Sequence, residues 1–262
     1  MCCLFLAASS TVAIAQTSVV DLVNPIIGTN GMGHTFPGAC VPFGLVQLSP
    51  DTDTIPHNVD GKYQPRSYEY CAGYQHKDSS IVGFSHTHFS GTGHSDLGDI
   101  LIMPTTGTLK LNPGTATNPD GGYRSRFSHG TEISRPGYYE VMLTDYGVKA
   151  QLTTTQRVGI HKYTYPTNSE NQRIILDMIH GIYNYDGKVL WTNIRVENDT
   201  LVTGYRITNG WARTNYTYFA MSFSKPITHY GCEEKAKVNY RGGYAKFNMK
   251  ENFADILGRK IV

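Results

Sequence analysis

The sequence predicts an all-β fold, a large antiparallel β-sandwich, and three observations carry that prediction. Short runs rich in aromatic and β-branched residues recur along the chain, which has 18 Tyr among its 262 residues. Turn residues, including many of the 27 Gly, separate these runs. Long helical periodicity is hard to find. Many short strands with regular turns are typical of a sandwich.

The expected strands follow one another with short turns between them. Tyr146-Gly147 joins two runs, and Asn198-Asp199 makes a good hairpin turn between Val196 and Leu201. The expected strands are residues 41–48, 81–88, 100–103, 138–144, 148–155, 159–165, 173–177, 189–197, 200–208 and 217–223.

The first residues resemble a secretory leader. Residues 2–8 form an apolar run, and Ala13-Ile14-Ala15 is a small-x-small site before Gln16, although a positively charged start is missing. We expect residues 1–15 to be a signal peptide and residues 16–262 one exported domain, periplasmic or secreted. No stretch is long and apolar enough to span a bilayer.

Charge and cysteine content exclude several classes of protein. The net charge is +2 and no basic run is interleaved with aromatics, so no nucleic-acid partner is expected. Beyond the leader the chain keeps Cys40, Cys71 and Cys232, an odd count that makes no disulfide framework. Buried free thiols are expected, with one pair as the alternative. The sequence contains no CxxC motif that would indicate a structural zinc site.

A glycine-rich segment, GTNGMGHTFPG, occupies residues 28–38. Such a segment lets a ligand or another chain approach the backbone closely. A phosphate loop is excluded because His34, not Lys, follows Gly33, and Phe36 breaks the GxGxxG spacing. A purely structural loop is the alternative.

A second segment, IVGFSHTHFSGTGHSDLGD, covers residues 81–99. If residues 83–89 form a strand, Phe84, His86 and His88 share one face, and His94 follows on a loop. These imidazoles could ligate zinc or iron, hydrogen-bond sugar hydroxyls, or be satisfied core residues.

A third segment, YEYCAGY, covers residues 68–74. Exposed tyrosines would stack on sugars, whereas buried ones would be core residues, which is expected for most of them.

Standard catalytic signatures such as GxSxG and HExxH are absent. Two Asp pairs, Asp51 with Asp53 and Asp96 with Asp99, do not show the opposed carboxylates of a glycosidase, and the first looks like turn capping.

Together these segments resemble glycoside hydrolase family 92. The similar stretches are VNPIIGTNGMGHTFPGACVPFGLVQLSPDT (23–52), YCAGY (70–74) and IVGFSHTHFSGTGHSDLGDILIMP (81–104). The resemblance implies a secreted or periplasmic, inverting exo-α-mannosidase of glycoprotein glycans. It also implies an N-terminal supersandwich, galactose-mutarotase-like, followed by an (α/α)6-barrel that supplies the acid, the base and the calcium ligands. Its implied partners are mannose-containing glycans and that barrel.

The sequence departs from the family because the barrel is missing, and residues 255–262 end without a cap or a polar tail. We therefore expect a chain cut before the barrel, inactive alone, with no catalytic or metal residue of its own. Five residues within or beside the similar stretches are expected to line a substrate cleft: His34, Phe36, Tyr68, His86 and His88. Tyr68 stands where the family usually has a Trp that lines the leaving-group subsite.

Two other functions remain open from the sequence. The chain could be a complete, stand-alone carbohydrate-binding module. It could also be a cupin-like metalloenzyme that uses His86, His88 and His94, although no Glu follows the His-x-His at the needed distance.

Overall fold

The structure is a computed structural model, and it describes residues 18–52, 55–91, 96–182, 184–185, 187–233 and 260–261. The expected signal peptide, residues 1–15, therefore lies outside the described residues, as do Asp53 and His94. Among the described residues, no helix has the length and apolar character needed to cross a membrane.

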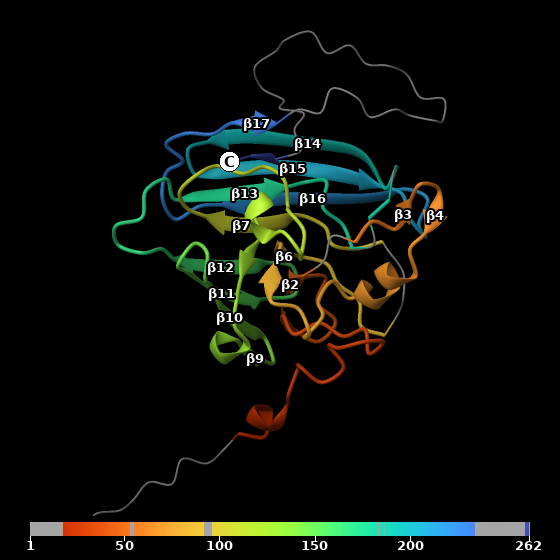
Figure 1. Cartoon of the computed structure of the whole chain (residues 1–262). Helices are drawn as coiled ribbons and strands as arrows, with labels where there is room; N and C mark the ends of the chain where they lie inside the picture. The colour runs from red at the N-terminus through yellow and green to blue at the C-terminus, as the bar shows by residue number, and fades with distance from the viewer. Residues whose placement is uncertain are drawn as a thin grey trace, which may run out of the picture.

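The centre of the molecule is a seven-stranded sheet in which every pairing is antiparallel. Figure 1 shows its middle strands between two other layers. In spatial order the strands are β1 (Ala39–Cys40), β2 (Gln47–Asp51), β6 (Gly83–Ser85), β7 (Leu101–Thr105), β13 (Arg173–Asp177), β18 (Lys260–Ile261) and β17 (Cys232–Glu233).

A four-stranded antiparallel sheet covers one face of the central sheet. Its burial alternates along β10 and β11, as expected for strands with one face in a core. The order is β12 (Gly159–Thr164), β11 (Val148–Thr154), β10 (Tyr138–Leu143) and β9 (Ile133–Arg135).

A three-stranded sheet covers the other face. Its strands, in order, are β14 (Val189–Asn198), β15 (Leu201–Thr208) and β16 (Asn215–Ser222). The predicted hairpin is present, because Asn198 pairs with Leu201 and the Asn198 side chain accepts a hydrogen bond from the Thr200 amide at 2.9 Å.

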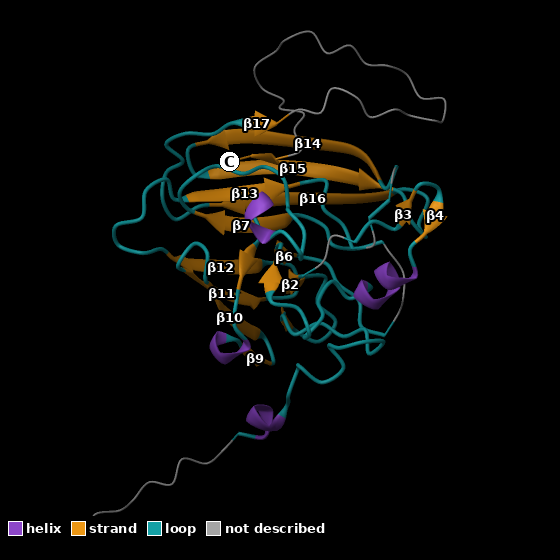
Figure 2. Ribbon diagram, viewed as in Figure 1, coloured by secondary structure: helices purple, strands orange, loops and turns teal. Residues whose placement is uncertain are grey.

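The remaining elements are short. Figure 2 shows that the helical segments are short and lie outside the sheets. The paired strands are β3 (Asn58–Val59) with β4 (Lys62–Tyr63) and β5 (Ser80–Ile81) with β8 (Ser125–Arg126). The 3-10 turns are η1 (Val19–Leu22), η2 (Pro65–Tyr70), η3 (Pro119–Gly121) and η4 (His129–Thr131).

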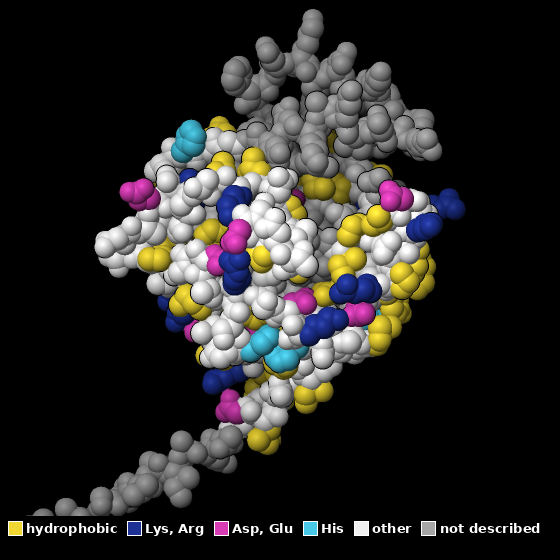
Figure 3. All heavy atoms as spheres, in the orientation of Figure 1, with side chains coloured by type: hydrophobic (Ala, Val, Ile, Leu, Met, Phe, Trp, Pro, Cys, Tyr) yellow, Lys and Arg dark blue, Asp and Glu magenta, His cyan; other side chains and the backbone are white. Residues whose placement is uncertain are grey.

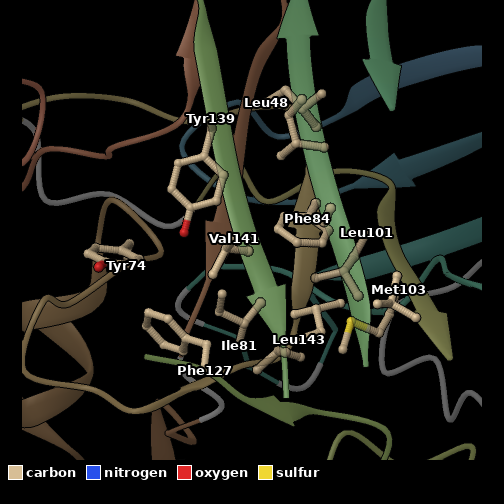
Figure 4. Close-up of a cluster of buried hydrophobic side chains, with 14 of the residues drawn as sticks. Leu48, Tyr74, Ile81, Phe84, Leu101, Met103, Phe127, Tyr139, Val141 and Leu143 are labelled. Atoms are coloured by element: carbon tan, nitrogen blue, oxygen red, sulfur yellow. The ribbon is translucent and has the colours of Figure 1, made fainter. Parts of the chain in front are cut away.

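Strand β7 explains why two cores form. Its side chains alternate between the two faces of the central sheet, and all five residues are buried. Leu101 and Met103 join the core shared with β10 and β11, whereas Ile102 joins the core shared with β14 and β15. Figure 4 shows the first of these cores, in which Leu101 and Met103 lie beside Phe84 and Leu143. The predicted all-β sandwich is confirmed, with the central sheet buried on both faces.

Most predicted strands appear within a residue or two of their expected ends, but two do not. The run 41–48 was expected as a strand, yet the strand begins only at Gln47. Pro42 has no amide hydrogen, and Phe43 adopts a φ of 58°, so the backbone turns here. The segment 81–88 is also split, into β5 and β6, and β6 ends at Ser85.

The described cysteines are free thiols, as the sequence analysis expected. Cys40 and Cys71 are free thiols, and burial raises the pKa of Cys71 to about 11. The Cys232 side chain lies outside the described part. Basic and acidic side chains are interspersed on the face in Figure 3, which shows no continuous basic area.

Candidate functional site

The glycine-rich loop at residues 28–38 folds back on itself. The Thr35 amide donates to the Gly28 carbonyl at 3.3 Å, and Gly28 has a φ of +83°. A Cβ atom at Gly33 would lie only 2.1 Å from that same carbonyl oxygen. Close contact within the loop's own backbone therefore requires glycine at this position.

The three segments singled out in the sequence meet around this loop. The Gln75 side chain, which follows the YEYCAGY segment, accepts from the Gly31 amide at 2.7 Å and donates to the Gly31 carbonyl at 2.9 Å. The Gly91 amide donates to the His34 carbonyl at 2.7 Å. Residues far apart in the sequence are thereby held as one surface.

His34, Tyr68 and Phe36 form the aromatic part of this surface. The His34 ring meets the Tyr68 ring edge-on, with centroids 5.0 Å apart, and the half-buried Phe36 ring lies 5.3 Å from the His88 ring. His34 is buried at an unusual φ of 50°, and among the described residues its Nε2 has no hydrogen-bond partner. A buried polar atom of this kind calls for a partner such as water or a ligand.

His88 lies beneath the aromatic surface in a buried polar cluster. Its Nε2 is 2.9 Å from Asp51 Oδ1, and its Nδ1 donates to the Gln47 carbonyl at 2.7 Å. The second Asp51 oxygen is 2.7 Å from His180 Nε2. His88 and Asp51 are each 1% exposed. His88 therefore has an acceptor at each ring nitrogen and acts as a support for the surface.

The charge of Asp51 follows from these contacts. Burial alone would raise the pKa of Asp51, but the attraction and hydrogen bonds of His88 and His180 outweigh it and hold the pKa well below its usual range. Asp51 is thus an ionised, fully engaged carboxylate and cannot donate a proton at neutral pH. Its expected role as a turn cap was wrong, because it ends strand β2 inside the core.

His86 lies elsewhere, between the central sheet and strand β12. Its Nδ1 donates to the Ile100 carbonyl at 2.6 Å, and its Nε2 is 3.0 Å from His161 Nε2. The other ring nitrogen of His161 is 2.7 Å from the Tyr163 hydroxyl. Burial chiefly lowers the pKa of His86, to about 4, so its imidazole is neutral at physiological pH.

The structure separates residues that the alternation had placed together. Phe84, His86 and His88 were expected on one face, but β6 ends at Ser85, so the two histidines turn to different partners. His94 lies outside the described residues, and within the described part His86 and His88 do not belong to a metal-ligating group. The placement of these residues does not favour a cupin-like metal centre.

Two aspartates of the same segment brace it against the three-stranded sheet. Asp96 accepts from the amides of Trp211 at 2.6 Å and Ala212 at 3.0 Å. Asp99 pairs with the buried Arg206 guanidinium at 2.8 Å. Both carboxylates are engaged with protein partners, so this pair offers no glycosidase acid and base.

Other residues of the site carried too weak a signal in the sequence. His161 lies in strand β12 and His180 in the loop after β13, and no spacing rule connects them to Asp51 or His86. Buried Lys188 donates to the carbonyls of Leu97 and Ile182, and burial lowers its pKa to about 7. Tyr70 and Tyr74 are buried, as expected for most tyrosines of their segment, whereas Tyr68 is half-buried.

Solved structures resemble this fold and share much of its sequence. An α-mannosidase of glycoside hydrolase family 92 from Bacteroides thetaiotaomicron, solved with mannoimidazole, is 39% identical with a TM-score of 0.77 and covers 92% of this chain. An inverting mannosidase of the same family and organism is 26% identical, has a TM-score of 0.63 and covers 94%. The chain spans 30% and 29% of those structures, respectively.

Sequence relatives agree. A protein described as an uncharacterized secreted glycosidase, from Arthroderma benhamiae, is 28% identical over 170 residues, which are 62% of this chain and 19% of that relative. The family profile described as the glycosyl hydrolase family 92 N-terminal domain matches residues 22–254. This chain therefore belongs to glycoside hydrolase family 92, as its N-terminal β-sandwich domain.

Proposed function

We propose that this domain forms one wall of the substrate cleft of a secreted exo-α-mannosidase. In this proposal the enzyme hydrolyses terminal α-mannosides of glycoprotein N-glycans with inversion, and a C-terminal barrel supplies the catalytic wall. The resemblance to an α-mannosidase, an inverting mannosidase and a secreted glycosidase supports it.

The observation that carries the proposal is the joining of the three segments into one aromatic surface. Tyr68 and Phe36 are half-buried rings, and a ring of this kind can stack on the apolar face of a sugar. The His34 ring lies edge-on against Tyr68, and its buried Nε2 has no partner among the described residues, so a water molecule could link it to a sugar hydroxyl. His88 and Asp51 hold this surface from beneath.

Calcium is assigned in this proposal to the barrel. Calcium takes six to eight oxygen ligands. The carboxylates near the aromatic surface do not form such a cage, because Asp51 is held by histidines, Asp96 by backbone amides and Asp99 by Arg206. In this proposal the described residues near the aromatic surface position the sugar, and the barrel holds the ion.

The chain alone is expected to be inactive. It provides positioning groups, but the Asp51 carboxylate beneath the aromatic surface is ionised and buried, so it cannot serve as the acid of an inverting pair. Incubating the 262-residue chain with an aryl α-mannoside, with and without calcium, should give no hydrolysis above a buffer blank. Turnover that is abolished by a chelator and by His86→Ala would overturn this assignment.

A domain exchange tests whether the aromatic surface contributes to hydrolysis when a catalytic barrel is present. The chain replaces the N-terminal domain of the α-mannosidase from Bacteroides thetaiotaomicron, and hydrolysis of an aryl α-mannoside is measured. We expect activity that falls at least about tenfold in Tyr68→Ala, since stacking and orientation are lost. Tyr230→Ala, a tyrosine 46% exposed in the loop before β17, is the matched control and should retain activity. Equal activity of the two variants would contradict the proposed wall.

A stand-alone carbohydrate-binding module is the second candidate, and one observation favours it. Tyr216 and Tyr218 on strand β16 are 55% and 70% exposed, and their rings are nearly parallel, 9° apart, with centroids at 6.5 Å. Mannoside binding by the isolated chain that is lost in Tyr218→Ala but not in Tyr68→Ala would support this alternative.

A further inference from the structure

A second cluster of potential ligands uses none of the residues of the aromatic surface and lies where the sandwich meets the loop after η2. His76, His129 and Glu132 each offer one ligand atom, and all three atoms lie within 4.8 Å of one another. His76 is 53 positions before His129, so sequence spacing gave no hint of the cluster. Histidine side chains also gather on part of the surface in Figure 3.

The local fold places His129 and Glu132 on the same side of the chain. His129 begins the 3-10 turn η4 and Glu132 follows its end, and side chains three residues apart are eclipsed in such a turn. His129 Nδ1 is 2.8 Å from Glu132 Oε2. The His76 ring lies against the His129 ring, with centroids 4.0 Å apart, and the His76 amide is anchored by the Thr29 carbonyl at 2.8 Å.

Two core tyrosines orient the Glu132 carboxylate. The Tyr74 hydroxyl donates to it at 2.9 Å, and the Tyr139 hydroxyl donates at 2.6 Å. The Glu132 side chain is only 3% exposed. Figure 4 shows both rings at one end of the core. Hydrogen-bonded carboxylates of this kind are typical of metal ligands, whose orientation is set by the groups behind them.

A buried carboxylate whose open side carries two imidazoles is a favourable setting for a small divalent cation. Imidazole and carboxylate together suit zinc, whereas calcium requires a cage of oxygen atoms. In a tetrahedral zinc site ligand atoms are about 3.4 Å apart, given bonds of about 2.0–2.2 Å. The His129 imidazole is 38% exposed, so it can rotate and bring the three ligand atoms from within 4.8 Å to the shorter spacing of a zinc site.

We propose that His76, His129 and Glu132 bind one zinc ion, with water completing its coordination. The ion would fasten the loop after η2, which also carries Gln75, to the start of strand β9. This site is independent of the proposed mannosidase function and of its calcium, because it uses two nitrogen ligands from this domain.

Zinc stoichiometry of the 262-residue chain tests the proposal. The chelator-treated chain is loaded with zinc chloride, desalted and analysed for metal by mass spectrometry, and calcium chloride is run in parallel. We expect about one zinc per chain and no retained calcium. Cobalt loading should give the visible absorption bands of a four-coordinate site with nitrogen ligands.

Variants identify the ligands. Glu132→Gln keeps an acceptor for the two tyrosines but removes the charge, and His129→Ala removes an exposed ring, so neither should unfold the chain. Each should weaken zinc binding roughly a hundredfold, and Tyr139→Phe about 10–100-fold. His229→Ala removes an exposed histidine outside the cluster and should change nothing. A wild-type chain without stoichiometric zinc, or binding that these variants leave unchanged, would overturn the site.

Discussion

His86 and His88 are two residues apart, yet they occupy opposite kinds of environment. His88 lies against the ionised Asp51 in the region beneath the aromatic surface. His86 lies between two sheets against another imidazole, His161, and burial keeps it neutral. The difference arises because strand β6 ends at Ser85, before both histidines, so strand alternation no longer places their side chains on one face. The same residue type therefore stabilises charge in one region and avoids it in the other.

The largest effect is expected from His88→Ala. This substitution leaves the buried Asp51 carboxylate with only His180 as a partner, and removing one member of a buried pair costs about 3–5 kcal/mol. Urea denaturation of the chain should show this loss in the free energy of unfolding. His229→Ala should change it by less than about 0.5 kcal/mol. A small effect of His88→Ala would mean that the two regions do not differ as described.

Gly73→Ala tests how tightly the chain packs around the buried Asp51 carboxylate. Gly73 has a φ of +81°, and a Cβ atom there would lie 2.0 Å from Asp51 Oδ1. We expect a loss of about 1–3 kcal/mol from backbone strain, with a further loss from the displaced carboxylate. Gly61→Ala is the matched control, since its φ is +77° and nothing lies within 4 Å. Equal losses in the free energy of unfolding would mean that backbone strain alone explains both variants. The contact with the Asp51 carboxylate would then contribute nothing.

As the pH falls, protonation of the paired histidines His86 and His161 should lower the free energy of unfolding before protonation of Asp51 does. His86 has a lowered pKa of about 4 in the folded chain, against about 6.5 when unfolded, so the unfolded state binds more protons between these values. The free energy of unfolding should therefore fall as the pH drops from about 6.5 to 4, by about 1–3 kcal/mol for this partly exposed pair of histidines. The ionised Asp51 adds its own loss only below about pH 4.

His161→Gln sharpens this test. An amide can still pair with His86, but it does not titrate, so part of the slope between pH 6.5 and 4 should disappear. Denaturation midpoints of both proteins across this range give the comparison. An unchanged slope would mean that other groups carry the pH dependence.

The smallest effect on stability is expected from Tyr68→Trp. The ring is half-buried in a short 3-10 turn, so the free energy of unfolding should change by less than about 0.5 kcal/mol. If Tyr68 lines the proposed cleft, however, the ratio of kcat/KM values for differently linked mannobiosides should change in the domain-exchanged enzyme. A ratio that stays constant would place Tyr68 outside the leaving-group subsite.

The sequence predicted the sheets well and the site only in outline. Alternation along residues 138–143 and 148–154 reflects burial on one face, which is a local pattern that periodicity detects. The convergence of the glycine-rich loop with Tyr68 and His88 came from family resemblance, because contacts such as Gly31 to Gln75 span 44 residues. Buried polar partners of this kind leave no periodic signal.

Two misreadings show where local rules fail. The apolar run at 41–48 looked like a strand, but Phe43 is fully exposed at a positive φ and Leu45 is 68% exposed. Asp51 looked like a turn cap, but it is 1% exposed and pairs with residues 37 and 129 positions away. In both cases tertiary contacts decide the conformation that the local sequence leaves open.

The central claim is that the loop 28–38 and its two neighbouring segments contact the mannoside. Hydrogen–deuterium exchange of the domain-exchanged enzyme, with and without mannoimidazole, tests it most directly. The account predicts slower exchange in residues 28–38, 68–76 and 86–91, and unchanged exchange in strand β16. Slowed exchange in residues 215–222 instead, or in none of these segments, would contradict it.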